Sequence, residues 1–149
     1  MKTIIRTHGT IILDDNTYNL INGKAGINLV GRNKNYPLVM KYYKGKMYQL
    51  ARLIIGCPKD KFVDHINGNS LDNRLNNLRI VTRTQNNQNK EHVGCHYNKR
   101  AKKYTTAIVV NKKRIWLGTF NTREEAISTY KKASLKYFGD YSYYRRNRL

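Results

Sequence analysis

Short runs of apolar and β-branched residues, separated by turn-forming residues, fill the first 55 positions of the chain. Two of these runs, at residues 10–13 and 38–43, are each followed by a polar stretch of the kind that ends a strand. This pattern predicts a small antiparallel sheet. A further run at residues 47–55 is apolar at helical and strand spacing alike. The expected turns of this region lie at residues 22–23, 31–33 and 44–45.

A different pattern begins after Pro58. Residues 62–66 and 79–82 have the composition of two short strands, and the Asn67-Gly68 pair after the first is a strong turn signal. The polar stretch between the strands carries leucines at positions 71, 75 and 78, and their spacing predicts a helical turn packed on the core.

A helix is predicted after the second strand. Thr82 or Thr84 is placed to cap it, and it would run through Asn86 to about His92. Strand, loop, strand and helix form a small unit that buries little apolar surface. Its many polar side chains therefore need an explanation other than packing.

From Gly94 the chain alternates with a period of two residues. Because successive residues of a strand face opposite sides, Ile115 and Leu117 should point to the core, and Arg114 and Trp116 away from it. The strands are expected at residues 96–99, 104–110 and 114–118, separated by basic turns.

The second half should close with a helix. Thr122 and Glu125 have the spacing of a capping box, and the apolar stripe behind them ends at Gly139. This helix should cover the inward face of the sheet. The tail at residues 141–149 is rich in tyrosine and arginine, and the sequence leaves open whether it docks on the domain or contacts a nucleic-acid backbone.

These elements predict an α+β protein with two domains. The first, residues 1–93, combines a β-rich region at residues 1–57 with the strand–loop–strand–helix unit at residues 58–93. The second, residues 94–149, packs a three-stranded antiparallel sheet on one helix and ends in the basic, tyrosine-rich tail.

Charge narrows the class of partner. The 149 residues include 29 Lys and Arg against 9 Asp and Glu, a formal net charge of +20. Residues 1–90 hold 15 basic and 5 acidic groups, and residues 91–149 hold 14 and 4, so the charge is not confined to one tail. This distribution favours a nucleic acid contacted along most of the molecule. A basic ribosomal-type or membrane-surface protein is the alternative that charge alone leaves open.

Cysteine usage and hydropathy exclude other classes. Cys57 and Cys95 lie far apart and form no Cys-x-x-Cys pair, which argues against a disulfide framework and a zinc knuckle. No apolar run approaches the ~18–20 residues that span a bilayer, and the N-terminus lacks the apolar region of a signal peptide. We expect an intracellular protein that is not secreted and has no membrane partner.

Asp64 and His65, at the end of a predicted strand, suit phosphodiester hydrolysis. The carboxylate can bind a hard cation such as Mg²⁺, and the imidazole can take a proton from water. Because neighbouring residues of a strand point to opposite faces, the two side chains can share a site only where the strand ends or bends. Asn67-Gly68 supplies that bend.

Around this pair the chain reads Val63-Asp64-His65-Ile66-Asn67-Gly68-Asn69, Asp72-Asn73-Arg74, Asn77-Leu78-Arg79, Val81-Thr82 and Gln85-Asn86. This spaced set resembles the HNH nuclease motif of phage and intron homing endonucleases. A spaced set is far more specific than an isolated Asp-His pair. A phage-encoded protein of this kind would work in the host cytoplasm or nucleoid.

The resemblance implies a ββα-metal finger at residues 58–93 with four functional residues. Asp64 and Asn86 would bind a divalent metal, Mg²⁺ or Mn²⁺, and Asn86 stands where many such enzymes have His. His65 would be the general base, and Asn77 would hold its ring in position. Each residue alone has an ordinary structural explanation, such as a cap or a solvated helix position, whereas their joint spacing favours the nuclease. The family commonly has His-Arg-Leu before Gly-x-Pro, where this chain has Ala51-Arg52-Leu53.

A second set of residues lies at 94–140. It comprises Arg114-Ile115-Trp116-Leu117-Gly118-Thr119-Phe120, Thr122 with Glu124-Glu125-Ala126, and Tyr130, Ala133 and Lys136-Tyr137-Phe138-Gly139. This set is similar to the APETALA-two / ethylene-response-factor DNA-binding domain, which lays a three-stranded sheet in the major groove. Arg114 and Trp116 occupy contact positions of that family. His96 and Asn98 stand where the plant factors have arginines, so the target sequence cannot be inherited from them.

These features predict a site-specific DNA endonuclease of the homing type, with one divalent metal and a histidine base, directed to double-stranded DNA by the sheet domain. A catalytically inactive, sequence-specific DNA-binding regulator is the alternative, and an RNA-binding or ribosome-associated protein comes third. We expect a monomer, because no dimer seam is evident, and no organic cofactor. The residues expected to contact DNA are Arg52, Arg79, His96, Asn98, Lys99, Arg100, Lys102, Lys103, Arg114 and Trp116.

Overall fold

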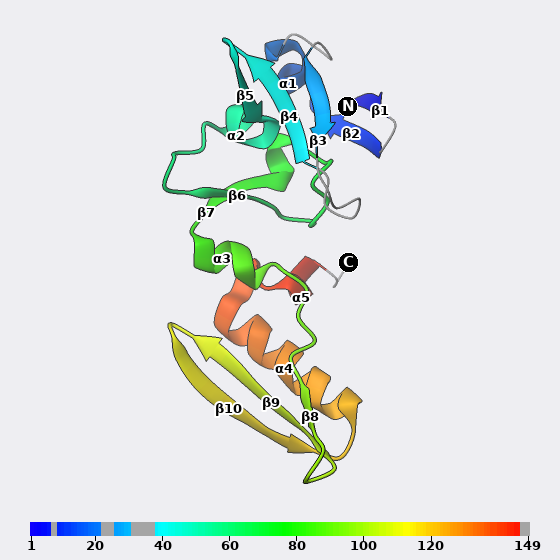
Figure 1. The fold of residues 1–149 in the computed structure, drawn as a ribbon, viewed down its shortest axis with the longest axis vertical. Coiled ribbons are helices and arrows are strands. Elements are labelled where there is room, and N and C mark those ends of the chain that lie inside the picture. The colour runs from blue at the N-terminus through cyan, green and yellow to red at the C-terminus, as the bar shows by residue number, and fades with distance from the viewer. Residues whose placement is uncertain (7–8, 22–25, 31–37, 147–149) are drawn as a thin grey trace. The chain divides into compact units, whose positions relative to one another are not determined.

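The computed structural model describes the chain except residues 7–8, 22–25, 31–37 and 147–149. The described residues form several small antiparallel sheets and a few helices (Figure 1), divided between a unit at Met1–Asn86 and a unit at Asn87–Leu149. The turns expected at residues 22–23 and 31–33 both lie outside the described residues. Within the described part of the chain, no helix is long and apolar enough to span a membrane.

The N-terminal half of the first unit is built from two sheets and two short helices. The elements in chain order are β1 (Lys2–Arg6), β2 (Gly9–Leu13), α1 (Asp15–Leu20), β3 (Ile27–Val30), β4 (Leu38–Tyr43), β5 (Lys46–Gln49) and α2 (Leu50–Ile55). Strands β1 and β2 form a hairpin, and β3, β4 and β5 form an antiparallel sheet in that order. The ambiguous run at residues 47–55 is therefore part strand and part helix.

Helix α1 is a difference from the sequence expectation, because residues 14–16 read as turn formers. Asp14 is extended at the N-cap position, and its carbonyl accepts the backbone N–H of Tyr18, which starts the helix. Thr17 is buried and Tyr18 packs on the core, so tertiary burial favours a helix where local composition favoured a turn. The core of this unit consists of Ile4, Ile11, Leu13, Ile27, Val39 and Leu50, with Leu71 among the half-buried residues packed against it.

The second half of this unit follows the predicted order of strand, loop, strand and helix. Its elements are β6 (Phe62–His65), the 3₁₀ turn η1 (Leu75–Asn77), β7 (Leu78–Val81) and α3 (Arg83–Gln88). Strands β6 and β7 are antiparallel, and Asp64 pairs with Arg79 in the ladder. Thr82 and Gln85 cap α3: Gln85 N–H donates to Thr82 Oγ1 at 3.3 Å, and Thr82 N–H donates to Gln85 Oε1 at 2.8 Å.

Two boundaries in this region differ from the prediction. The helical turn expected from leucines 71, 75 and 78 is confined to Leu75–Asn77, because Leu71 lies instead on the N-terminal core. Helix α3 ends at Gln88 rather than near His92, whose ring stacks on Tyr130 of the second unit at 5.3 Å between centroids.

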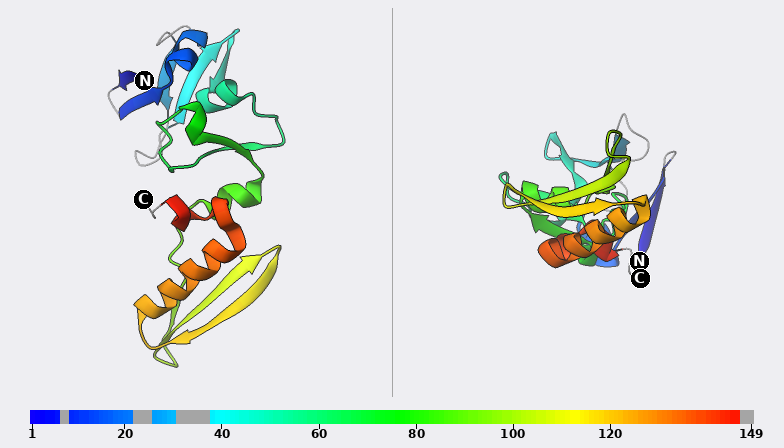
Figure 2. Two further views of the ribbon diagram at one scale, coloured as in Figure 1. Left: turned by 180° about the vertical axis from the view of Figure 1, so that it is seen from behind. Right: turned by 90° about the horizontal axis from the view of Figure 1, so that it is seen from below.

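In the second unit, helix α4 runs along one face of a three-stranded sheet (Figures 1 and 2). The elements are β8 (His96–Asn98), β9 (Lys103–Val110), β10 (Lys113–Phe120), α4 (Arg123–Phe138), the 3₁₀ turn η2 (Gly139–Tyr141) and α5 (Tyr143–Arg146). Ile115 and Leu117 pack towards Ile108, whereas Trp116 is 57% exposed, so the predicted sorting of the two faces is confirmed. The Thr122–Glu125 capping box and the helix end at Gly139 are confirmed as well.

The tail and the residues before β8 pack on α4. Ser134 and Ser142 share a hydrogen bond of 2.8 Å, and Tyr144 donates from its hydroxyl to the carbonyl of His92. The tail therefore docks on its own unit through Ser142 and Tyr144. The junction expected after residue 93 lies within this second unit, which begins at Asn87.

Candidate active site and nucleic-acid interface

Asp64 is buried at the end of β6, where its carboxylate faces an arginine. It is 6% exposed, and Arg79, its partner across the ladder, donates from Nε at 2.8 Å and lies 2.6 Å from it through Nη2, both to Oδ2. Both guanidinium nitrogens approach the same carboxylate oxygen, so the contact is charge-assisted but does not pair two N–H groups with two oxygens. Arg79 was expected to contact DNA, which stays a prediction; in the structure its guanidinium is paired with Asp64.

His65, the next residue, is half-buried beside Asn73. Its Nε2 lies 3.4 Å from Asn73 Oδ1. Burial lowers the pKa of His65 below its ordinary value, an effect that the Asn73 hydrogen bond and the charges of Asp64 and Asp72 partly oppose. Burial therefore favours the neutral imidazole, the form that can accept a proton.

A cavity of about 120 Å³ opens beside the His65 ring. Ala51 forms part of its wall, at the position where HNH enzymes commonly have a histidine. The cavity is lined by Leu38, Val39, Gln49, Ala51, Val63, His65, Ser70 and Asn73.

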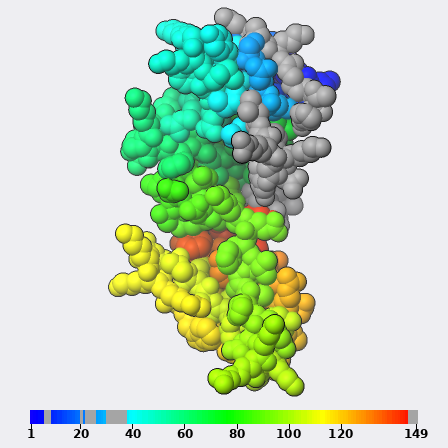
Figure 3. Space-filling view, viewed as in Figure 1, coloured from blue at the N-terminus to red at the C-terminus, as the bar shows by residue number. Residues whose placement is uncertain are grey.

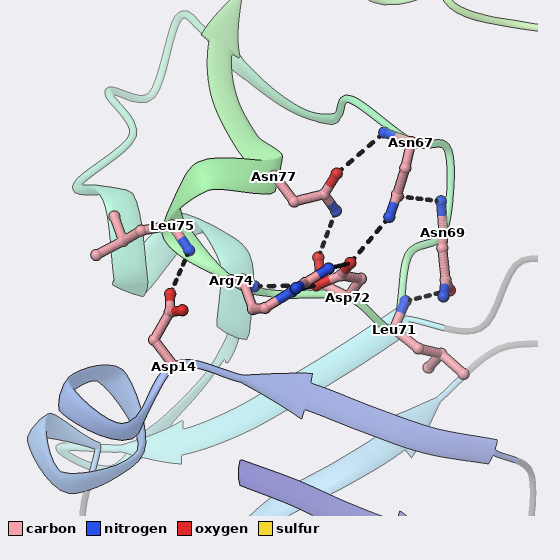
Figure 4. Close-up of polar contacts among 8 residues, drawn as sticks. All are labelled: Asp14, Asn67, Asn69, Leu71, Asp72, Arg74, Leu75 and Asn77. Carbon is pink, nitrogen blue, oxygen red and sulfur yellow. Dashed lines mark hydrogen bonds and ion pairs between the residues drawn. The ribbon is translucent and has the colours of Figure 1, made fainter. Parts of the chain in front are cut away.

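Asn77 ties together the two ends of the loop between β6 and β7 (Figure 4). Its Oδ1 accepts the backbone N–H of Asn67 at 3.0 Å, and its Nδ2 donates to the carbonyl of Asp72 at 2.7 Å. Asn77 is only 6% exposed, so these bonds fix the loop from inside. It was expected to hold the His65 ring, which stays a prediction; the hydrogen bonds of its side chain shape the loop, and Asn73 lies beside the ring.

Asp72 is the second fixed point of this loop. Its carboxylate accepts Asn67 Nδ2 at 2.9 Å, Arg74 Nε at 2.8 Å and Arg74 Nη2 at 2.7 Å (Figure 4). The side chain of Asp72 is 2% exposed, and the Arg74 guanidinium holds the pKa of its carboxyl below the ordinary value. Asp72 therefore serves the loop as a charged acceptor.

The loop is also docked on the N-terminal hairpin. Ile12 of β2 donates its N–H to the carbonyl of Leu71 and accepts the N–H of Asn73, each at 2.9 Å. Further along, the N–H of Leu75 donates to Asp14 Oδ2 at 2.7 Å (Figure 4). Ile12 and Asp14 therefore help to build the surroundings of His65.

Asn86, the second expected metal ligand, is half-buried on α3 as the last residue of the first unit. Its N–H donates to the Thr82 carbonyl, which sets it on the first turn of the helix. Among the described residues, no group of three His, Cys, Asp or Glu side chains is placed to hold a metal. A metal site here would depend on the mixed donors Asp64 and Asn86.

Arg52, expected to contact DNA, is occupied by backbone carbonyls. Its Nη1 donates to Lys61 O at 2.8 Å and its Nη2 to Pro58 O, with a longer bond to Cys57 O at 3.3 Å. The guanidinium thus fastens the turn that leads into β6. Its partners are carbonyls five to nine residues further along the chain, in the segment between α2 and β6.

The outward face of the second sheet gathers most of the other expected contacts. Residues paired across an antiparallel ladder share a face, and the register pairs Asn98 with Lys103 and Trp116 with Ala107. The face opposite α4 therefore carries His96, Asn98, Lys103, Thr105, Ala107, Val109, Arg114 and Trp116. Asn98 also closes the β8–β9 turn, since its Oδ1 accepts the backbone N–H of Arg100 and of Ala101, each at 3.0 Å.

This face and its turns carry only one sign of charge. Between His92 and Arg123 the sequence has no Asp or Glu and seven Lys or Arg. The turn residues Lys99, Arg100 and Lys102 are exposed. Side chains of both turns, yellow-green and yellow in Figure 3, project from the surface. Such a surface suits a polyanion.

Comparison with known proteins bears on the first unit. Residues 51–88 match the family model of the HNH endonuclease. The matched segment contains Asp64, His65, Asn77 and Asn86, and it supports a nuclease that acts on DNA. The comparisons with curated proteins and with solved structures give no match.

Proposed function

We propose that this protein is a site-specific DNA endonuclease of the homing type, in which β6, β7 and α3 form a ββα-metal finger. The observation that carries the proposal is the HNH endonuclease match over residues 51–88, which covers all four expected site residues. The neutral, half-buried His65 beside the buried carboxylate of Asp64 supports it.

His65 acts as the general base in this proposal. It takes a proton from the attacking water as the water oxygen bonds to phosphorus, and the bond from phosphorus to one bridging oxygen breaks. Asp64 and Asn86 hold one divalent metal, Mg²⁺ or Mn²⁺, which when bound supplies positive charge at the reacting phosphate. Asn77 keeps the loop after β6 in the shape that presents His65. No organic cofactor is required.

The donor set fits a hard cation. A carboxylate and a carboxamide offer oxygen ligands of the kind that Mg²⁺ prefers. Arg79 already neutralises part of the charge on Asp64, with its Nη2 at 2.6 Å from Oδ2. We therefore expect modest metal affinity in the absence of DNA.

The second unit delivers the nuclease to double-stranded DNA by laying its outward sheet face in the major groove, as APETALA-two-like domains do. Arg114 and Trp116 lie on that face with His96 and Lys103, and α4 covers the opposite face. Phosphate contacts from the basic turns provide affinity, and contacts from the strands provide specificity. The protein acts as a monomer.

One observation favours a second candidate, a catalytically inactive DNA-binding regulator. The Asp64–Arg79 ion pair satisfies the carboxylate without a metal, as expected of a finger that binds none. The endonuclease should cleave DNA and the regulator should not, whereas both should bind DNA.

The deciding experiment incubates wild type and His65→Ala with plasmids that carry the DNA flanking the gene, in Mg²⁺ and in EDTA. Wild type should cut in Mg²⁺ alone, and His65→Ala should be slower by about 10²–10⁴-fold while retaining DNA, since only the proton acceptor is lost. Asp60→Ala, which removes an exposed carboxylate four positions before Asp64, is the matched control and should cut like wild type.

Sequencing the cut ends distinguishes a nick from a double-strand break. Equal cleavage by His65→Ala and wild type would refute the general base. Retention of DNA without cleavage in Mg²⁺ and in Mn²⁺ would favour the regulator, and a preference for structured RNA over duplex DNA would refute both candidates.

A further inference from the structure

Asn73 holds a fixed orientation against the ring of the proposed general base. It is 1% exposed, and its Oδ1 lies 3.4 Å from His65 Nε2, a long hydrogen bond. The other end of the carboxamide, Nδ2, donates to the carbonyl of Ser70 at 3.3 Å. Turning the amide over would place two acceptor oxygens together, so the Ser70 contact fixes Oδ1 towards the ring.

We propose that Asn73 is a positioning residue that sets the tautomer of His65, with the hydrogen on Nε2 and the basic lone pair on Nδ1. A carboxamide oxygen only accepts hydrogen bonds, so the ring nitrogen facing it must carry the hydrogen. In a neutral imidazole the other nitrogen is then the proton acceptor. This inference rests on the proposed function for its catalytic meaning, and it goes beyond that function in naming Asn73 and the reactive nitrogen.

The backbone of Asn73 is held as firmly as its side chain. Its N–H donates to Ile12 O at 2.9 Å, and Ile12 N–H donates to Leu71 O at 2.9 Å. These two hydrogen bonds form a parallel bridge between Asp72 and Ile12 of β2. Leu71 packs on the N-terminal core against Gly9, where a Cβ would lie only 2.6 Å from Leu71 Cδ1. The N-terminal hairpin therefore positions Asn73, and through it the ring of His65.

The other asparagines of the loop have different hydrogen-bond partners. Asn77 binds the backbone of Asn67 and Asp72, and Asn69 Oδ1 accepts the N–H of Leu71 at 3.0 Å. Asn69 is exposed and belongs to the same loop, so Asn69→Ala loosens the turn without removing the Asn73 carboxamide. It serves as the matched control.

The first test reads the tautomer directly in the full-length, metal-free protein. Long-range ¹H–¹⁵N correlation of the four histidine rings is recorded at about pH 8, where an ordinary imidazole is neutral, and His65 is assigned by the loss of its signals in His65→Gln. We expect hydrogen on Nε2 in wild type and in Asn69→Ala, and a mixture of tautomers in Asn73→Ala. Hydrogen on Nδ1 in wild type would overturn the inference whether or not the protein cuts DNA.

The second test separates positioning from folding. Asn73→Ala should lower the cleavage rate by about tenfold to a hundredfold while the dissociation constant for DNA stays at the wild-type value. Asn73→Asp keeps an acceptor oxygen beside Nε2 but sets its second oxygen against the Ser70 carbonyl, so it should recover only part of the lost rate. If Asn73→Ala unfolds, the inference is still tested by the tautomer of His65 in the wild type and by the cleavage rate of Asn73→Asp.

If the Asn73→Ala protein is folded and keeps the wild-type tautomer, Asn73 does not set the tautomer of His65 and only shapes the loop. Absence of cleavage by wild type would contradict the proposed function and leave the tautomer test intact. The two failures are therefore distinguishable.

Discussion

Asp72 shows how a single buried carboxylate shapes the loop around the candidate site. It accepts hydrogen bonds from Asn67 and Arg74 through its side chain, and from Asn77 through its backbone carbonyl. Neutralising it would leave donors that still point at its former charge. The loop thus depends on a charge that takes no part in the proposed chemistry.

We predict that Asp72→Asn lowers the free energy of unfolding by about 1–3 kcal/mol, the usual cost of leaving a buried hydrogen-bonding group poorly matched. Arg74 lowers the pKa of Asp72 below its ordinary value of 3.8, so the stabilisation is complete above that pH and is lost as the pH falls through the lower, folded-state pKa. Thermal unfolding of both proteins across pH should show a constant gap near neutrality that closes in acid, below about pH 4. A gap that widens in acid would contradict this account.

For single residues, the sequence predicted a role where several motif residues lie close together. It could not predict a role that depends on hydrogen-bond partners far away in the chain. Asp64 and His65 could be singled out because a strand end and a turn follow each other locally. Asn73 could not be told apart from Asn67 and Asn69, because its role arises only when β2, far away in sequence, docks on the loop. The sole signal was its place in the Asp72-Asn73-Arg74 segment of the motif.

Among the elements, the segment before β8 is constrained by close packing. Gly94 has φ +72°, and a Cβ there would lie 2.1 Å from Tyr130 Cγ on α4. The carbonyl of Gly94 also accepts the buried hydroxyl of Thr106 on β9. A side chain at position 94 would therefore force the β8–β10 sheet and helix α4 apart, and only glycine fits.

We predict that Gly94→Ala destabilises the second unit by about 2–4 kcal/mol, because overpacking adds to backbone strain. The matched control is Gly139→Ala, at φ +53° with nothing within 4 Å of its Cβ, which should cost only about 1 kcal/mol of strain. Thermal unfolding followed by circular dichroism measures both. Equal losses would show that the Tyr130 ring moves aside at little cost.

Elements with strong local signals were predictable. The two faces of β10 follow from alternation, and α4 begins and ends where its capping box and its glycine lie. The length of α3 and the existence of α1 were not predictable, because packing of His92 on Tyr130 and of Tyr18 on the core decides them. Tertiary contacts set these boundaries rather than propensity.

For the molecule as a whole, charge sets the expected behaviour on DNA. Both units are basic, and the net charge of +20 predicts that affinity falls steeply with salt. With 6–10 phosphate contacts, binding should weaken by about 10³–10⁵-fold between roughly 50 and 200 mM salt.

We predict that Lys103→Ala, on the outward face of the second sheet, lowers the slope of log affinity against log salt by about one. Lys132→Ala removes an exposed lysine of α4, which covers the opposite face, and should leave that slope unchanged. Binding of fluorescent duplexes over a salt series provides the measurement. If both substitutions had the same effect, the sheet face would not be the contact surface.

The docking of the loop on β2 also affects when the site forms during folding. Leu75 and Asp14 are 61 residues apart, and contacts so distant in sequence close a large segment of chain, which slows folding. The surroundings of His65 are therefore complete only after the beginning of the first unit has met its end. A nascent or truncated chain would hold His65 without the order around it, so the proposed nuclease activity would require this docking.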